Sequence, residues 1–342
     1  MRATNHRWLG TLAVALILLG AAALPVPASA SAIRVLTGIA YAAPQPATSQ
    51  GHFLDLYLPT HSRQPTPLII WVHGSGWMAE NGRESADVVA SHFVPRGYAV
   101  AGVSIRSSGF AQFPGQLYDI KAAIRFLRAN AARYHLDPHR FGIIGESSGG
   151  WTAAMAAVTG DVPRLEGNVG VRGPSSRVQA AAPFYPPTDF LQMDPFMPQD
   201  CVPFNEDFDL TACHADPRSP ESRLLGCAIE ACPQAVTRAD PSTYVSRNDP
   251  PMLLVHGQQD LYVPWQQSLL LYRAAARACA DAALVLLPRG EHGQWNEFLT
   301  DPAVRTGARI QRTDDCRQTR PRPVQPSWNS LIQFFDRSLN HR

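Results

Sequence analysis

Lysine is almost absent from this sequence, and charge of either sign is scarce. Of the 342 residues 17% are charged, Lys121 is the only lysine, and the formal net charge is +2. Without residues 1–30, which hold two arginines and no acid, the net charge is zero. A neutral chain gives no electrostatic reason to expect a nucleic acid or an anionic membrane as partner. The 45% of hydrophobic residues instead suits a globular domain with an ample core.

The longest apolar stretch lies within the first thirty residues. Two arginines precede Trp8–Leu24, and the small residues Ala28, Ser29 and Ala30 follow it. This order predicts a secretory signal peptide over 1–30, and therefore export to the cell envelope, the periplasm or the medium. The alternative is an uncleaved membrane anchor. The stretch is short for a span of about 20 residues and prolines follow it, so we expect no stable span after cleavage.

Cysteine occurs six times, an even number that in an exported protein favours disulfide bonds. The six candidates are Cys201, Cys213, Cys227, Cys232, Cys279 and Cys316. A zinc site would need clustered cysteine and histidine at closer, regular spacing. The spacing here fits that poorly, so no metal is expected.

Short apolar runs alternate with helical segments along most of the chain. The predicted strands are 31–40, 52–58, 67–72, 98–104, 141–144, 178–184, 252–256 and 283–287, with the last run expected to end the sheet. The predicted helices are 85–95, one that begins at Pro114, 151–158, 265–280 and 328–339. Such alternation predicts an α/β fold with a mostly parallel, doubly wound sheet and helices on both faces. Functional groups on such sheets gather at the carboxyl ends of the strands.

Residues 186–242 interrupt this alternation. The segment holds four of the six cysteines, is rich in proline and charged residues, and has no clean periodicity. A structureless loop of that length is improbable inside a compact domain. We therefore expect a cap insert over the functional site, stapled by disulfides, within a single domain over 31–342. A flexible excursion far from the site is the alternative.

The sequence RFGIIGESSGGW, residues 140–151, joins a buried strand to an alanine-rich helix through a tight turn. Ser147 is the central residue of G-x-S-x-G, the pattern of a nucleophile elbow. Gly145 and Gly149 flank it at positions where a β-carbon would collide with the neighbouring strand or helix. The N-terminus of the following helix favours negative charge at the same place. Ser147 is therefore the candidate nucleophile.

GESSGG resembles the elbow of α/β-hydrolases of the carboxylesterase type. The run FPGQLYDIKAAIRFLRANAARYHLDPHRFGIIGESSGG, residues 113–150, resembles their feruloyl-esterase-like branch, close to the hormone-sensitive-lipase-like esterases. The resemblance extends over about 54–293, and the cysteine-rich insert falls outside it. It implies an α/β-hydrolase fold and hydrolysis of a small-molecule ester, without a metal or an organic cofactor.

A serine nucleophile needs a base and a third group that orients the base. In α/β-hydrolases these follow in the order serine, acid, histidine. Asp260 follows the predicted strand 252–256, and His292 follows the predicted strand 283–287. Imidazole suits the base because its pKa lies near working pH. The candidate triad is therefore Ser147, Asp260 and His292.

Three other ionisable residues compete for these roles. Asp189, after the strand 178–184, is the second choice for the acid. His256 precedes the acid, which is the wrong order for the base, so we interpret it as structural. Glu146, beside the candidate nucleophile, is expected to support the elbow rather than react.

The sequence HGSGW, residues 73–77, resembles the HGGG-type motif that supplies oxyanion donors in lipases and esterases. The resemblance implies that the N–H groups of Gly74 and Ser75 donate, together with that of Ser148 after the nucleophile. Ser75 departs from the family pattern, which usually has glycine there. Which of Gly74, Ser75 and Gly76 donate stays open.

The cysteines divide between the insert and the rest of the chain. We expect Cys279–Cys316 to form, because both residues lie outside the insert, and this bridge would close a loop around His292. Within the insert Cys227–Cys232 is favoured because its short gap closes easily, which leaves Cys201–Cys213. Other pairings within the insert stay open.

Together these patterns predict an exported serine carboxylesterase that works through an acyl-enzyme on Ser147. One alternative is a serine peptidase of the prolyl-oligopeptidase type, for whose usual propeller domain this chain is too short. The other is a non-catalytic binding module on a hydrolase fold, disfavoured because all three triad positions are filled in the right order.

Overall fold

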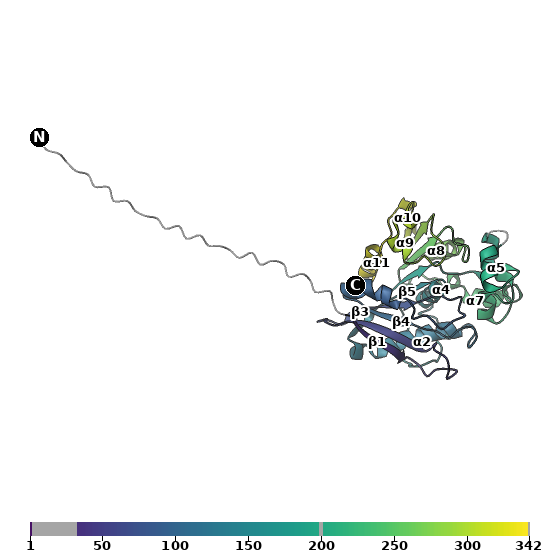
Figure 1. Ribbon diagram of the computed structural model, residues 1–342, viewed down its shortest axis with the longest axis horizontal. Helices are drawn as coiled ribbons and strands as arrows, with labels where there is room; N and C mark the ends of the chain where they lie inside the picture. The colour runs from purple at the N-terminus through teal and green to yellow at the C-terminus, as the bar shows by residue number, and fades with distance from the viewer. Residues whose placement is uncertain (2–32, 198–200, 341–342) are drawn as a thin grey trace. The chain divides into compact units, whose positions relative to one another are not determined.

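The structure, a computed structural model, describes residue 1 and the ranges 33–197 and 201–340 (Figure 1). The signal peptide predicted over 1–30 therefore lies outside the described residues, apart from Met1. Within the described ranges, no helix combines the length and the apolar character needed to cross a bilayer.

A sheet of 11 strands organises residues 31–342, in the order β1-β2-β4-β3-β5-β6-β7-β8-β9-β10, with β11 also paired to β9. The strands are β1 (Ile33–Ala40), β2 (Phe53–Pro59), β3 (Thr66–Val72), β4 (Ala99–Val103), β5 (Leu136–Glu146), β6 (Ala180–Phe184), β7 (Met252–Gly257), β8 (Ala282–Leu287), β9 (Arg309–Asp314), β10 (Arg317–Gln318) and β11 (Arg322–Pro323). From β4 to β8 all neighbours pair in parallel. The strands outside this block pair antiparallel. The mostly parallel α/β-hydrolase sheet predicted from the sequence is confirmed.

Helices follow most of the parallel strands. They are α1 (Ala86–Phe93), α2 (Gly115–Ala129), α3 (Ala131–Tyr134), α4 (Ser148–Val158), α5 (Val202–Phe208), α6 (Pro220–Leu225), α7 (Pro233–Ala239), α8 (Gln266–Ala278), α9 (Glu297–Thr300), α10 (Pro302–Arg305) and α11 (Trp328–Asn340).

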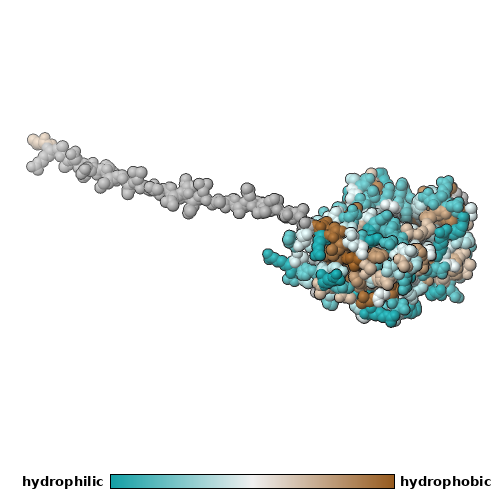
Figure 2. Space-filling model, turned by 60° about the horizontal axis from the view of Figure 1, so that its bottom comes forward, coloured by the Kyte–Doolittle hydropathy of each residue, from teal (hydrophilic) through white to brown (hydrophobic). Residues whose placement is uncertain are grey.

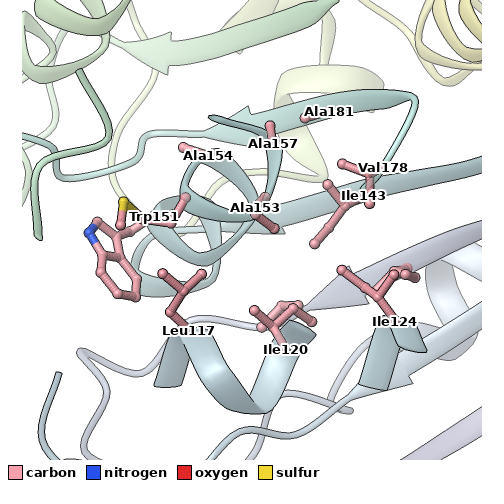
Figure 3. Close-up of a cluster of buried hydrophobic side chains, with 14 of the residues drawn as sticks. Leu117, Ile120, Ile124, Ile143, Trp151, Ala153, Ala154, Ala157, Val178 and Ala181 are labelled. Carbon is pink, nitrogen blue, oxygen red and sulfur yellow. The ribbon is translucent and has the colours of Figure 1, made fainter. Parts of the chain in front are cut away.

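Apolar side chains on both faces of the sheet hold these helices in place. In β3 the side chains of Leu68 and Ile70 belong to one buried cluster, and those of Ile69 and Trp71 to another. The first cluster packs under α2, α4 and α8, and the second under α1 and α11. Figure 3 shows three side chains of α2, among them Leu117, pointing toward α4 and β5. Both faces are therefore covered, which fixes the carboxyl ends of the parallel strands in one row.

Two sequence predictions about strands were wrong. The run 283–287 does not end the sheet, because β9 follows it and pairs antiparallel with β8. The sequence of β9, RIQRTD, alternates too many polar residues to form an apolar run. The elbow strand is also longer than predicted. β5 begins at Leu136, before Asp137 and Pro138, because Leu136 already pairs with Thr66 of β3.

The described residues of the segment 186–242 form the short α-helices α5, α6 and α7, joined by 3₁₀ turns. In the view of Figure 1, α5 and α7 both lie to the right of the sheet. Disulfides join Cys201–Cys213 and Cys227–Cys232 within the segment, and Cys279–Cys316 outside it. These are the three pairs favoured from the sequence. The two bridges within the segment close short loops, with sequence separations of 12 and 5, and Cys279–Cys316 closes a longer one of 37 that contains β8.

One edge of the sheet is partly apolar. On the face shown in Figure 2, hydrophobic side chains gather beside the start of the described chain, and polar side chains surround them. The edge strand β1 pairs only with β2, and its Val35 is 47% exposed.

Candidate active site

The turn between β5 and α4 holds Ser147 in a strained conformation. Its φ is 57° and its ψ is −125°, in the region that L-residues rarely adopt. A β-carbon on Gly145 would lie 2.2 Å from the carbonyl oxygen of Gly149, and one on Gly149 would lie 2.1 Å from that of Val72. The turn therefore requires glycine at both flanking positions, and its geometry is that of a nucleophile elbow.

Three side chains from different strand ends form one hydrogen-bonded chain. Nε2 of His292 lies 3.1 Å from Oγ of Ser147. Nδ1 of the same ring lies 2.8 Å from Oδ2 of Asp260. Because the ionised carboxylate can only accept, Nδ1 carries the proton and Nε2 is free to accept from the serine hydroxyl. The structure thus brings together the three residues that the sequence singled out.

The Asp260 carboxylate is fully buried yet well supplied with hydrogen bonds. Its Oδ1 accepts the backbone N–H groups of Tyr262 and Val263 at 2.9 and 2.8 Å. Burial raises the pKa of Asp260, but attraction to His292 and hydrogen bonds from His256 and His292 outweigh it. The pKa therefore lies well below its ordinary value, and the group is charged at neutral pH.

Two tyrosines hold the His292 ring, which is 18% exposed. The ring of Tyr262 stacks on it at 5.1 Å between centroids, and that of Tyr185 packs at 4.8 Å. Burial lowers the pKa of His292, but the charge and hydrogen bond of Asp260, together with the charge of Glu146, raise it above its ordinary value. Sequence reasoning missed both tyrosines. Their signals are weak, since each is one aromatic residue after a strand.

In the loop after β3, the backbone N–H groups of Gly74 and Ser75 both have partners. The Gly74 N–H donates to the carboxylate of Glu146. The Ser75 N–H donates to Oγ of Ser148 at 2.9 Å. Ser148 opens α4, so its own N–H has no partner within the helix. Two of the expected oxyanion donors, Ser75 and Ser148, are therefore in direct contact with each other, and Ser148 is the residue next to Ser147.

Asp189 and His256, two of the competing residues, have partners of their own, and His256 also contacts the acid, with its Nε2 3.4 Å from Oδ2 of Asp260. Asp189 caps the 3₁₀ turn Phe190–Gln192, and its side chain accepts the N–H of Leu191 at 3.2 Å. His256 Nε2 donates to the carbonyl of Val263 at 2.9 Å, and its Nδ1 lies 2.7 Å from Oγ of Ser268. Asp189 therefore has a capping role, and His256 has the structural role expected from its place in the sequence.

A small cavity of about 40 Å³ lies against Ser147 and His292. Its walls are formed by Gly76, Trp77, Ser147, Ser148, Pro187, Phe204, Phe208, Pro220, Glu221, Tyr262, Val263 and His292. Five of these residues come from the segment 186–242. That segment therefore forms a wall of the site, and the aromatic and proline side chains make most of this wall apolar.

The described residues offer one cluster with potential metal ligands, Asp194, Cys201 and Cys213. The two cysteines are joined in a disulfide, so neither has a thiolate to offer. The carboxylate of Asp194 accepts the backbone N–H groups of His214 and Ala215. The cluster is therefore a structural junction of the insert.

A sequence model of the BD-FAE family matches residues 54–275, more than half of the chain. Two curated relatives come from Mycobacterium tuberculosis. The protein described as probable carboxylic ester hydrolase LipM is 30% identical over 202 residues, which cover 59% of this chain and 43% of LipM. Esterase LipQ is 30% identical over 225 residues, which cover 66% of this chain and 48% of LipQ. The chain thus spans somewhat less than half the length of these relatives.

A solved structure matches almost end to end. It is described as a truncated form of a carbohydrate esterase from gut microbiota. The two chains are 28% identical with a TM-score of 0.72, and the match covers 92% of this chain and 99% of the other.

Proposed function

Because this chain belongs to the BD-FAE family of carboxylesterases with the α/β-hydrolase fold, we propose that it hydrolyses carboxylic esters with Ser147 as the nucleophile. The observation that carries the proposal is the chain of hydrogen bonds from Ser147 through His292 to Asp260. The esterase names of the relatives, LipM and LipQ, support the same reaction class.

In this mechanism Oγ of Ser147 attacks the ester carbonyl carbon while Nε2 of His292 takes the hydroxyl proton. The carbonyl π pair moves onto oxygen, which becomes an oxyanion. When that pair returns, the C–O bond to the alcohol breaks, and His292 delivers its proton to the departing oxygen. Water then attacks the acyl-enzyme by the same steps and releases the acid. Asp260 stabilises the imidazolium and keeps its tautomer fixed.

We assign the oxyanion donors to the backbone N–H groups of Ser75 and Ser148. The first residue of a helix presents its N–H outward, where the helix dipole favours negative charge. The Ser75 N–H would exchange its bond to Oγ of Ser148 for one to the oxyanion. The role of Gly74 is then to fix the loop through Glu146.

Residues 186–242 act in this proposal as a cap, because Phe204, Phe208, Pro220 and Glu221 line the cavity. The small cavity favours short acyl groups. We further propose that residues 1–30 are a signal peptide and that the protein is exported. Three disulfides support this, since such bonds persist in oxidising compartments.

The test is hydrolysis of 4-nitrophenyl esters with acyl chains of two to about twelve carbons by the mature protein. We expect activity to be highest for the acetyl or butyryl ester and to vanish in Ser147→Ala. Ser91→Ala is the matched control, since Ser91 is exposed on α1 and bonds only its own helix. Full activity in Ser147→Ala, with a folded protein by circular dichroism, would refute the proposal.

A further inference from the structure

The cap brings one carboxylate into the wall of the cavity. Glu221 lies in the first turn of α6, and its side chain is only 4% exposed. The preceding Pro220 lies against the loop after β3, residues 73–77, which we call the oxyanion loop. A β-carbon on Gly76 of this loop would be 3.2 Å from the β-carbon of Pro220. Glu221 is therefore held beside the reacting groups by packing of the cap on this loop.

Glu221 has a buried neighbour but no hydrogen bond to it. Nδ1 of His214 lies 3.1 Å from its Oε2, and Phe204 covers the imidazole at 4.0 Å between ring centroids. Within the described chain, neither Oε2 of Glu221 nor either nitrogen of His214 has a partner in hydrogen-bond geometry. The two residues are thus in ion-pair contact without a well-aligned hydrogen bond, and the carboxylate keeps acceptor positions that a bound donor can fill.

Of the other polar side chains in the cavity wall, Nε1 of Trp77 has no hydrogen-bond partner but can only donate, and the catalytic pair and Tyr262 have partners. Ser147 and His292 bond each other, and the hydroxyl of Tyr262 bonds the carboxylate of Asp207. Most of the remaining wall is aromatic or proline. A hydroxyl group on a bound ester would therefore find one unengaged acceptor in this cavity wall, the carboxylate of Glu221.

We propose that Glu221 is a specificity-determining residue, which accepts a hydrogen bond from a hydroxyl group of the substrate close to the ester. This inference rests on the proposed function. It names the substrate class as short esters with a hydroxyl on the alcohol or on the acyl part, in preference to plain aliphatic esters of equal size. A hydroxyl on the substrate gains a hydrogen bond to this carboxylate, whereas an aliphatic group in its place displaces water from the acceptor without replacing that bond.

Two matched pairs of esters test the proposal. 2-Hydroxyethyl acetate against propyl acetate places the hydroxyl on the alcohol. Ethyl glycolate against ethyl propionate places it on the acyl part. Release of acid, followed by pH-stat titration, gives kcat/KM for each ester, and the ratio within each pair is the readout. Whichever pair responds shows on which side of the ester Glu221 acts.

In one of the pairs, we expect Glu221→Leu to lower the ratio of kcat/KM for the hydroxyl ester to that for the plain ester by about tenfold or more. This factor corresponds to the loss of one hydrogen bond to a charged group. Because the plain ester has no hydroxyl to donate, its kcat/KM should change less than that of the hydroxyl ester in the same pair. Glu221→Gln keeps an acceptor without charge, so its ratio should fall by a smaller factor of about three. Glu206→Leu, at an exposed glutamate of α5, is the matched control and should leave both ratios unchanged.

Equal losses on both members of each pair would show that Glu221 only supports the cap, and unchanged ratios would show no role; either result overturns the proposal. If Glu221→Leu does not fold, an unchanged ratio in Glu221→Gln overturns it as well. The proposed function fails separately, by absence of 4-nitrophenyl acetate hydrolysis in the wild-type protein.

Discussion

The carboxylate of Glu146 accepts the backbone N–H of Gly74, so the residue before Ser147 holds the loop that follows β3. The same carboxylate oxygen lies 3.0 Å from Nδ1 of His73. Glu146 is 4% exposed, so water does not compete strongly for these contacts. The elbow and the oxyanion loop are thus coupled by one side chain that takes no part in the proposed proton transfers.

Removing this side chain should loosen the oxyanion loop. We expect Glu146→Ala to lower kcat for 4-nitrophenyl acetate by about 10- to 100-fold, less than full loss of one oxyanion donor, with a small change in KM. Initial rates measured on the purified variant over a range of substrate concentrations give both kcat and KM. Glu84→Ala is the control, because Glu84 contacts the other ring nitrogen of His73, Nε2, but its side chain is 63% exposed. A normal kcat in Glu146→Ala would contradict the positioning role.

The pH dependence should report His292. Its neutral form is the base, so kcat/KM rises with pH through the pKa of His292, which lies above the ordinary 6.5. Asp260→Asn removes the charge that raises this pKa, so the acid limb should move to lower pH. The kcat of the Asp260→Asn variant should be lower than that of the wild-type protein by a factor on the order of 10⁴.

The position of the acid limb is read from kcat/KM of the Asp260→Asn variant on an activated ester, measured as a function of pH. Asp87→Asn is the control. Asp87 is exposed on α1, so its removal should leave the limb in place. A limb that moves to higher pH in Asp260→Asn, or does not move, would contradict the assigned charge pairing.

The elbow should not tolerate a β-carbon at Gly149. The nearest atom is the carbonyl oxygen of Val72, in a buried strand that cannot move aside cheaply. We expect Gly149→Ala to lower the free energy of unfolding by about 3 kcal/mol or more, at the upper end for overpacking. Gly109→Ala should be nearly neutral, since its nearest neighbour would be Oγ of Ser107 at 3.6 Å. Equal midpoints of urea unfolding for the two variants would contradict this.

The elbow and the order of the candidate triad could be predicted because their signals are local. Gly145 and Gly149 are required because neighbouring backbone atoms approach too closely to leave room for a β-carbon. Asp260 and His292 follow two adjacent parallel strands, β7 and β8. Since the carboxyl ends of such strands share one edge, strand assignment alone places these residues near each other.

Contacts between distant segments could not be predicted in the same way. The pair of His214 and Glu221 forms inside an insert whose helices are too short to show periodicity. The bond from Gly74 to Glu146 joins residues 72 positions apart. β9 is polar, and its pairing with β8, β10 and β11 rather than an apolar pattern defines it as a strand. Each depends on three-dimensional packing that leaves no regular trace in the sequence.

The most direct test of the account is covalent labelling of the wild-type protein with a fluorophosphonate, followed by peptide mass spectrometry. The account predicts one adduct, on Oγ of Ser147, because that hydroxyl alone is activated by His292 and Asp260. Labelling should disappear in Ser147→Ala and fall strongly in His292→Ala. An adduct on another serine, or no adduct in a protein that hydrolyses 4-nitrophenyl acetate, would contradict the assignment of Ser147 as the nucleophile.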